Sequence, residues 1–187
     1  MRYHLVMQTI LLNALRESDT LTHREWNEKP SAKKWSKKEV LGHLIDSAYN
    51  NHQRIIRFEA QKNLCFYGYD QDDWVIKNNY QRRDIGELLK NWEITNRHLA
   101  ALIESIPQTL MHKEFIHHNL HQICMNKFPA DKKATLSYLI WDYLFHLEHH
   151  LVQILPNYEK IHTALKRPGK DIQCNRIKTA VSWWAIR

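Results

Sequence analysis

The sequence contains little glycine, proline or cysteine, and each shortage excludes a class of structure. Four glycines and five prolines in 187 residues supply too few turn residues for a β-sandwich or a β-barrel. The three cysteines, Cys65, Cys124 and Cys174, are odd in number, far apart and without a CxxC pair. We therefore expect free thiols, and neither a disulfide framework nor a zinc ribbon.

Long apolar runs are also missing. No stretch approaches the roughly 20 consecutive apolar residues that a membrane-spanning helix needs. The N-terminal residues 1–8 lack the apolar core and the small-residue cleavage site of a signal peptide. These absences predict a cytoplasmic protein that has no membrane partner.

The residues that are abundant indicate a folded, helical protein. Hydrophobic residues make up 43% of the chain, with seven Trp, eight Tyr and five Phe, and the length suits one domain. We therefore expect the all-α class. The net charge of +7 suggests a nucleic-acid partner, but the basic residues are scattered and accompany no nucleic-acid-binding motif. Solvated surface charge is the preferred interpretation of this excess.

Apolar residues recur at helical spacing in four segments. The four predicted helices span residues 3–17, 36–59, 84–106 and 136–155. Helix-start signals support three of them: a Ser36–Glu39 capping box, an acidic cap at Asp84 and an N-cap at Thr135. Pro156 stops the last segment.

The last predicted helix is mostly apolar, as expected of a buried helix, but it carries a stripe of polar residues. Asp142, His146, His149 or His150, and Gln153 follow one another at steps of three and four residues. His146 and His150 are an i, i+4 pair whose imidazoles converge as a chelating pair does. The alternative is two histidines that lie at the surface or form ordinary hydrogen bonds.

A second stripe begins inside the predicted helix 36–59. His43, Asp46 or Ser47, Asn50 and Arg54 share one face of it. His43 can therefore complete the pair in the last helix as a third ligand. The alternative for His43 is a core histidine that is hydrogen-bonded to a carbonyl group.

The remaining segments show no regular spacing of apolar residues. Residues 63–83 are rich in aromatic and acidic side chains and predict an ordered loop, whereas residues 108–133 form a long crossover. The crossover holds a dense histidine cluster, for which no regular pattern predicts a shared face: His112, His117, His118 and His121. We expect a short helix within residues 158–165. The predicted domain is residues 1–165, followed by a basic tail of unassigned structure, residues 166–187.

Two motifs resemble those of the DinB/YfiT-like superfamily. They are Lys34-Trp-Ser-Lys-Lys-Glu-Val-Leu-Gly-His-Leu-Ile-Asp-Ser-Ala48 and His146-Leu-Glu-His-His-Leu-Val-Gln-Ile154, in that order and separated by a further helix. The resemblance implies a four-helix bundle in which His43, His146 and His150 hold a divalent metal, with His149 pointing aside. The basic tail departs from the family pattern.

The resemblance also implies metal-dependent chemistry, because the family includes hydrolases and transferases that use a low-molecular-weight thiol such as bacillithiol, mycothiol or glutathione. We expect transfer of such a thiol to an electrophilic small molecule. The alternatives are a hydrolase that uses metal-bound water, or a metal-binding or dimerising protein without turnover.

Finer expectations concern the identity of the metal, the residues around it and the oligomeric state. Zinc or nickel is the expected ion, with iron(II) or manganese as alternatives. Asp46 or Asp142 is expected to orient a ligand histidine, and Asn50 and Arg54 to meet an anionic cofactor or substrate. We also expect a homodimer.

Overall fold

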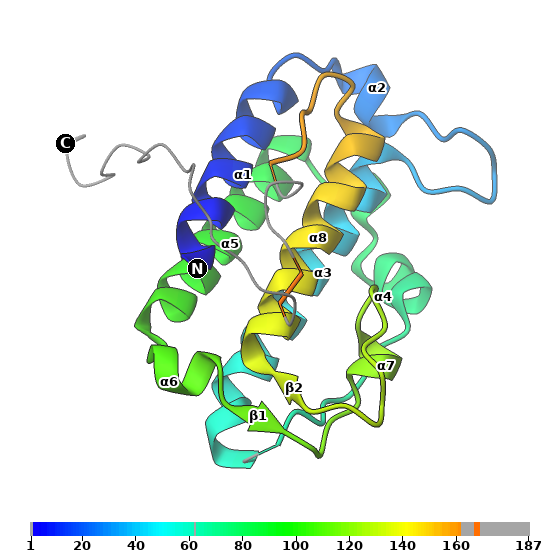
Figure 1. Ribbon diagram of the computed structural model, residues 1–187. Helices are drawn as coiled ribbons and strands as arrows, with labels where there is room; N and C mark the ends of the chain where they lie inside the picture. Colours follow the sequence, from blue (N-terminus) through cyan, green and yellow to red (C-terminus); the bar gives the residue numbers. More distant parts are fainter. Residues whose placement is uncertain (1, 62, 162–166, 169–187) are drawn as a thin grey trace.

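The computed structural model describes residues 2–61, 63–161 and 167–168 and is mostly helical (Figure 1). The long helices are α1 (Tyr3–Ser18), α3 (Lys37–Gln61), α5 (Ile85–Ser105) and α8 (Leu136–Ile154). The short elements are α2 (His23–Asn27), α4 (Gln71–Asn78), the 3₁₀ turn η1 (Tyr80–Arg82), α6 (Gln108–Met111) and α7 (Leu120–Ile123), with β1 (Glu114–Phe115) pairing antiparallel to β2 (Ala134–Thr135). The predicted all-α, four-helix bundle with a long crossover before its last helix is confirmed.

Of the four long helices, α1 and α8 run in one direction along the bundle and α3 and α5 run in the opposite direction, as Figure 1 shows. The start of α1 meets the end of α5, where His4 Nε2 lies 3.6 Å from Glu104 Oε1. By contrast, α3 and α5 run side by side in the same direction. Because parallel neighbours cannot be joined by a tight turn, the long segment 63–84 leads the chain back to the end of the bundle at which α3 begins.

The predicted helix starts are made by the expected side chains. Ser36 Oγ accepts a hydrogen bond from Glu39 N at 3.1 Å, and Glu39 Oε2 accepts one from Ser36 N at 2.8 Å, which completes a capping box. Asp84 caps α5 and Thr135 caps α8 in the same manner, through the backbone N–H three residues later. These caps satisfy N–H groups that have no partner within the helix.

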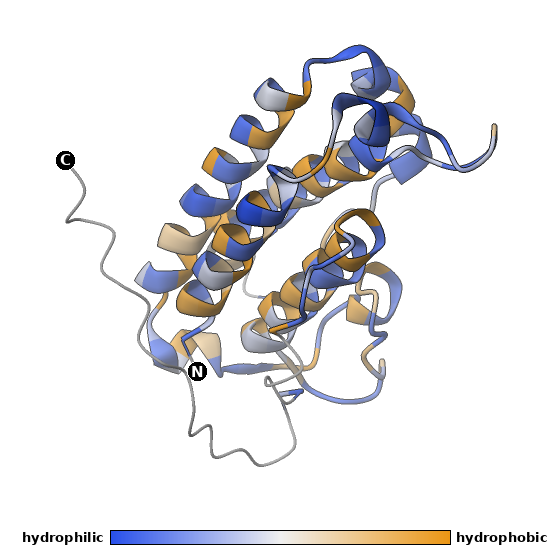
Figure 2. Cartoon of the chain, turned by 90° about the horizontal axis from the view of Figure 1, so that it is seen from above, coloured by the Kyte–Doolittle hydropathy of each residue, from blue (hydrophilic) through white to orange (hydrophobic). Residues whose placement is uncertain are grey.

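The core lies where the apolar faces of the long helices meet. Figure 2 shows orange, apolar residues alternating with blue, hydrophilic ones along the helices, as expected of helices buried on one side. Met7 and Ile10 of α1, Leu44 of α3, Leu99 of α5 and Leu144 of α8 are fully buried. No helix in the described part of the chain is long and apolar enough to cross a membrane.

The segment 63–83 is more regular than predicted, because it contains α4 and η1. Asp70 Oδ1 caps α4 by accepting from Asp73 N, and Asn79, with φ of 51°, ends it in the left-handed conformation. Only Val75 of α4 and Tyr80 of η1 are buried. One buried side chain in each element gives no visible helical period, which explains why the pattern predicted a loop.

The predicted short helix at 158–165 is not seen in its described part. Residues 158–161 are irregular, and residues 162–166 lie outside the described residues. The predicted tail, 166–187, also lies outside them apart from residues 167 and 168. Glu148 of α8 holds the start of this segment, since its Oε1 accepts hydrogen bonds from Tyr158 Oη at 2.8 Å and from Ile161 N at 2.6 Å.

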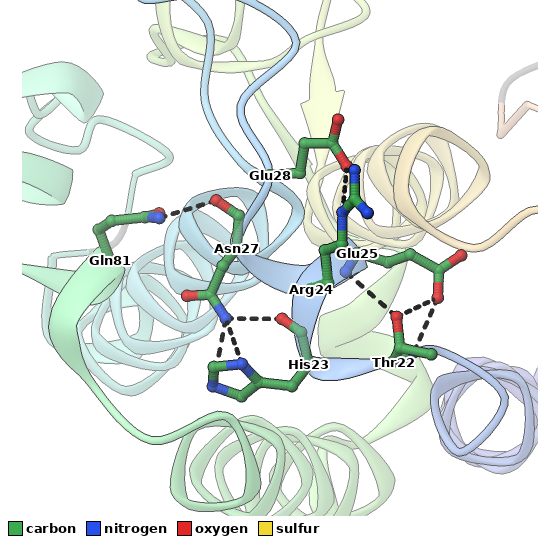
Figure 3. A network of polar contacts seen from close by, with 7 residues as sticks. All are labelled: Thr22, His23, Arg24, Glu25, Asn27, Glu28 and Gln81. Carbon is green, nitrogen blue, oxygen red and sulfur yellow. Dashed lines mark hydrogen bonds and ion pairs between the residues drawn. The ribbon is translucent and has the colours of Figure 1, made fainter.

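A polar network at one end of the bundle fixes the start of α3. Figure 3 shows the second capping box, in which Thr22 and Glu25 start α2, and the hydrogen bond from Gln81 Nε2 to the carbonyl oxygen of Asn27. Gln81 Oε1 accepts in turn from Ser36 Oγ at 2.6 Å. One side chain of η1 therefore joins α2 to the first turn of α3, next to Trp35.

Candidate metal centre

The structure brings His43, His146 and His150 together between α3 and α8. One nitrogen from each of the three rings lies within 4.8 Å of the others, and His43 Nε2 and His146 Nε2 are 3.0 Å apart. His43 is buried, and the other two are partly exposed. Tetrahedral zinc with Zn–N bonds of 2.0–2.1 Å holds ligand nitrogens about 3.3 Å apart, so the His43–His146 spacing is close to that of a chelating pair.

All three imidazoles are kept neutral by their surroundings. Burial, followed by the neighbouring His150, lowers the pKa of His43 to about 4. Burial also holds the pKa of His146 well below its ordinary value and lowers that of His150. Neutral imidazoles have the free lone pair that a metal ion needs, so the three side chains fit a divalent metal at neutral pH.

The Nδ1 atoms of the two α8 histidines, His146 and His150, each contact a neighbouring side chain. His150 Nδ1 lies 3.0 Å from Gln153 Oε1, and His146 Nδ1 lies 3.4 Å from Ser47 Oγ. These contacts leave the Nε2 atom of each ring directed to the centre. Gln153 also contacts His149 Nε2 at 2.9 Å, so His149 belongs to the rim of the site.

The Nδ1 atom of His43 is buried without a hydrogen-bond partner among the described residues. The ring is instead held by aromatic contacts. Its centroid lies 5.3 Å from that of Trp35 and 6.4 Å from that of Tyr69, which stacks on it. Within the described part of the chain, the one polar contact of this ring is with His146. The Nε2 atom of His43 therefore faces the three-histidine cluster.

A cavity of about 420 Å³ opens beside the histidines. Its wall combines side chains of α3 and α8 with residues of two connecting segments, 63–83 and 108–133. It includes Ser47, Asn51, Arg54, Tyr69, Gln122, Cys124, Met125, Asp142 and Tyr143 besides the three histidines. A second cavity of about 760 Å³, lined by Trp35 and by Lys33, Lys34 and Lys37, contains none of the histidines. We therefore assign the site to the smaller cavity, whose size suits a small molecule.

The two carboxylates predicted to orient a ligand histidine bind other groups. Asp46 Oδ1 accepts hydrogen bonds from Tyr80 Oη at 2.7 Å and from Asn78 Nδ2 at 3.1 Å, whereas its Oδ2 is buried without a partner among the described residues. Burial raises the pKa of Asp46 to about 6. Both oxygens of Asp142 accept from the backbone N–H groups of residues 125 and 126. These aspartates anchor α4, η1 and the crossover around the cavity.

The two predicted ligand-binding residues lie in different places. Asn50 donates to the carbonyl oxygen of Asp46 on its own helix, and it is not among the cavity-lining residues that the structure describes. Arg54 is buried and lines the cavity, as does Asn51. Their binding roles stay predictions.

The pattern of the sequence did not reveal Tyr69, Asn51 and Cys124 as neighbours of the site. Tyr69 and Cys124 come from irregular segments, where no period predicts which way a side chain points. For Asn51 a signal existed, because it lies four residues after Ser47 and donates to the Ser47 carbonyl oxygen at 2.9 Å.

The histidines of the crossover form no comparable cluster. His118 Nε2 lies 2.7 Å from the carbonyl oxygen of Lys132, and the ring centroids of His118 and His121 are 6.2 Å apart. Within the described part of the chain, His43, His146 and His150 are the one group of ligand-type side chains that is close enough to hold a metal.

Comparison with known proteins agrees with this fold. The chain resembles a solved structure, YfiT from Bacillus subtilis, with a TM-score of 0.65 and 18% sequence identity over 81% of each chain. That protein is described as a probable metal-dependent hydrolase with an unusual four-helix bundle topology. No curated protein matches the chain significantly. Residues 11–154, from the second half of α1 to the end of α8, match the DinB superfamily, and since this match covers most of the chain, the chain belongs to the DinB superfamily.

Proposed function

We propose that this protein is a divalent-metal-dependent enzyme that transfers a low-molecular-weight thiol to an electrophilic small molecule. The observation that carries the proposal is the convergence of three neutral imidazoles, His43, His146 and His150, at the wall of a 420 Å³ cavity. Three protein ligands are typical of catalytic zinc sites, which keep a coordination position for water or substrate.

A bound divalent ion would lower the pKa of the thiol or water, so that its deprotonated form is available as the nucleophile at neutral pH. Zinc or nickel suits the all-imidazole donor set best, and iron(II) and manganese are alternatives. The protein supplies orientation: Ser47 and Gln153 contact the outer nitrogens of His146 and His150 and limit rotation of their rings. Trp35 and Tyr69 cover the ring of His43 and keep water from it.

Hydrolysis with water as the nucleophile is the second candidate function. It is favoured by the likeness to YfiT, a protein described as a probable metal-dependent hydrolase. The same three histidines would serve both reactions, and only the nucleophile would differ. A protein that holds metal without turnover is the third possibility that the experiment must separate.

The test begins with elemental analysis of protein that is purified without a histidine tag. The metal-loaded protein is then incubated with bacillithiol, mycothiol or glutathione and with 1-chloro-2,4-dinitrobenzene or an epoxide, and in parallel with esters and amides. We expect conjugation that needs one particular thiol, and that is lost in the His43→Ala variant. Cleavage of an ester or amide without thiol would support hydrolysis instead. No turnover with any pair would favour a metal-binding protein.

We also propose that the protein acts as a homodimer on a small-molecule substrate. Sedimentation equilibrium of the full chain, with metal and after chelation, tests the oligomeric state. A single species with the mass of one chain at micromolar concentration would contradict the dimer without affecting the proposed chemistry.

A further inference from the structure

Arg54 is a buried cation that pairs with no carboxylate among the residues that the structure describes. It lies on α3 about three turns beyond His43, it is only 9% exposed, and it lines the cavity of the metal centre. Its Nη1 atom donates to Asn51 Oδ1 at 3.4 Å and its Nη2 atom to the carbonyl oxygen of Tyr67 at 3.3 Å. Both distances are long for hydrogen bonds of a charged donor. The Nε atom is buried and has no partner among the described residues.

This arrangement is unfavourable for the protein alone. Arginine stays protonated in proteins, so burial leaves a positive charge that has lost much of its hydration. Burial lowers the pKa of Arg54, although the nearby Tyr69, Cys124 and Asp142 act in the opposite direction. Arg97 on α5 is a contrast, because its guanidinium binds Glu93 at 2.7 Å.

The acidic group that faces Arg54 compensates its charge only in part. Asp142 lies near enough to act on the pKa of Arg54, but the two form no ion pair in the described structure. The carboxylate of Asp142 is already bound by the backbone N–H groups of Met125 and Asn126 and by the Asn126 side chain. Among the described residues no carboxylate pairs with Arg54, so its charge can be compensated by an anion that enters the cavity.

We propose that the cavity binds a small molecule through a carboxylate group that pairs with Arg54, while the rest of that molecule extends toward the three histidines. The inference rests on the proposed function, since it names the kind of substrate or co-substrate that the same site takes. The planar guanidinium fork matches the two oxygens of a carboxylate, and helical side chains lean toward the helix N-terminus, which here is the direction of His43. The volume of about 420 Å³ holds a small molecule of this type.

Asn51 is the positioning residue in this arrangement. Its Oδ1 atom accepts from Arg54, while its amide nitrogen donates to the carbonyl oxygen of Ser47, whose hydroxyl contacts the ligand histidine His146. One continuous run of contacts on α3 thus joins the anion-binding group to the metal centre. A carboxylate that binds Arg54 is therefore held at a fixed distance from the three histidines, where the other end of the bound molecule would react.

The test measures binding of acetate, succinate and inorganic phosphate to the full chain by calorimetry at pH 7.5, both loaded with zinc and after chelation. Succinamide is the uncharged control ligand. Arg54→Met is compared with Arg57→Met, which removes an exposed arginine from the same helix. We expect saturable carboxylate binding to the chelated protein, weakened about tenfold or more by Arg54→Met and unchanged by Arg57→Met.

A second measurement separates ligand binding from a structural role. If Arg54 serves a ligand, Arg54→Met removes an uncompensated charge and should melt at the same temperature as the parent protein or higher. A clear drop in melting temperature, with carboxylate binding retained, would overturn the inference. Binding of succinamide as tight as succinate would overturn it too, and so would tighter binding of phosphate, which would assign a phosphorylated ligand.

The two proposals fail in different ways. Arg54-dependent binding of carboxylates to the chelated protein supports the inference even if no reaction is found with any thiol. Thiol transfer or hydrolysis without carboxylate binding would leave the metal-dependent enzyme standing and remove the role of Arg54.

Discussion

Each histidine of the candidate metal centre is held in place by a different kind of neighbour. His43 is held by aromatic rings, His146 by a serine hydroxyl and His150 by the amide of Gln153. The three rings therefore do not depend on one shared support. Removing any one of them should leave the other two in place but lower the number of ligands to two.

We expect His43→Ala, His146→Ala and His150→Ala each to abolish tight metal retention, because two imidazoles bind a divalent ion much more weakly than three. His117→Ala, at an exposed position in the crossover, is the matched control and should leave the metal content unchanged. Elemental analysis after dialysis against a mild chelator measures both. One full equivalent of metal in the His43 variant would contradict the assignment.

Asp46 gives a prediction about pH. Because burial raises its pKa from 3.8 to about 6, ionised Asp46 destabilises the fold above pH 6, and that cost is absent below pH 4. Asp46→Asn should therefore stabilise the chelated protein at pH 7.5 by up to about 3 kcal/mol and have little effect at pH 4.

Urea unfolding of both proteins at the two pH values measures the difference. The amide oxygen that Asp46→Asn introduces can still accept from the Tyr80 hydroxyl, so loss of that contact does not obscure the result. A variant that is less stable than the parent at pH 7.5 would show that the carboxylate charge is compensated in the folded state.

Among single residues, the sequence predicted those whose position follows from helical spacing. His146 and His150 are one turn apart on α8, and the stripe on α3 leads from His43 toward Arg54. Tyr69 and Cys124 could not be predicted in this way, because their segments have no period that fixes the direction of a side chain. The predicted stripe contains Asn50, whereas the cavity follows the Ser47 side of the helix and includes Asn51.

At the scale of elements, α3 touches η1 so closely that only glycine fits at one position. A Cβ atom on Gly42 would overlap the ring of Tyr80. Gly68 is a matched position, since a Cβ there would meet nothing within 4 Å.

We expect Gly42→Ala to destabilise the protein by about 1–3 kcal/mol through overpacking, even though alanine favours the helix. Gly68→Ala should change the stability little. Thermal melts of the two variants compare them directly. Equal melting temperatures would mean that Tyr80 can move away from α3 at little cost.

Elements with strong end signals were predictable, and weakly buried ones were not. The caps Ser36, Asp84 and Thr135 mark α3, α5 and α8 to within a residue or two, because each caps a long amphipathic run. The helix α4 has an equally good cap in Asp70 but buries only Val75. Periodicity detects burial on one face, so a short helix that packs through one side chain escapes it.

For the whole molecule, bound metal should make stability depend on pH. Burial and the neighbouring His150 lower the pKa of His43 from 6.5 to about 4, so the chelated protein should lose stability as pH falls through that window. The metal-loaded protein should melt higher at pH 7.5, by roughly 5–10 °C if metal exceeds its dissociation constant about a hundredfold. The difference should shrink toward pH 5, because protons compete for the same lone pairs.

Melting curves between pH 7.5 and pH 5, recorded with metal and with chelator, test this expectation. Zinc, nickel, manganese and iron(II) are each tried at saturation. Equal melting at pH 7.5 with all four ions would mean that the histidines do not form a metal site in the folded protein, and the proposed function would fail with it.

The long sequence separation between the histidines of α3 and α8 has a consequence for how the protein is made. His43 and His146 are 103 residues apart in sequence, and they meet only when α8 has packed against α3. During synthesis α3 leaves the ribosome long before α8 exists, so the nascent chain offers a metal ion one histidine of the three. On the proposed function, capture of the ion is therefore among the last events of biogenesis, and a chain that ends before His146 would leave the ribosome without it.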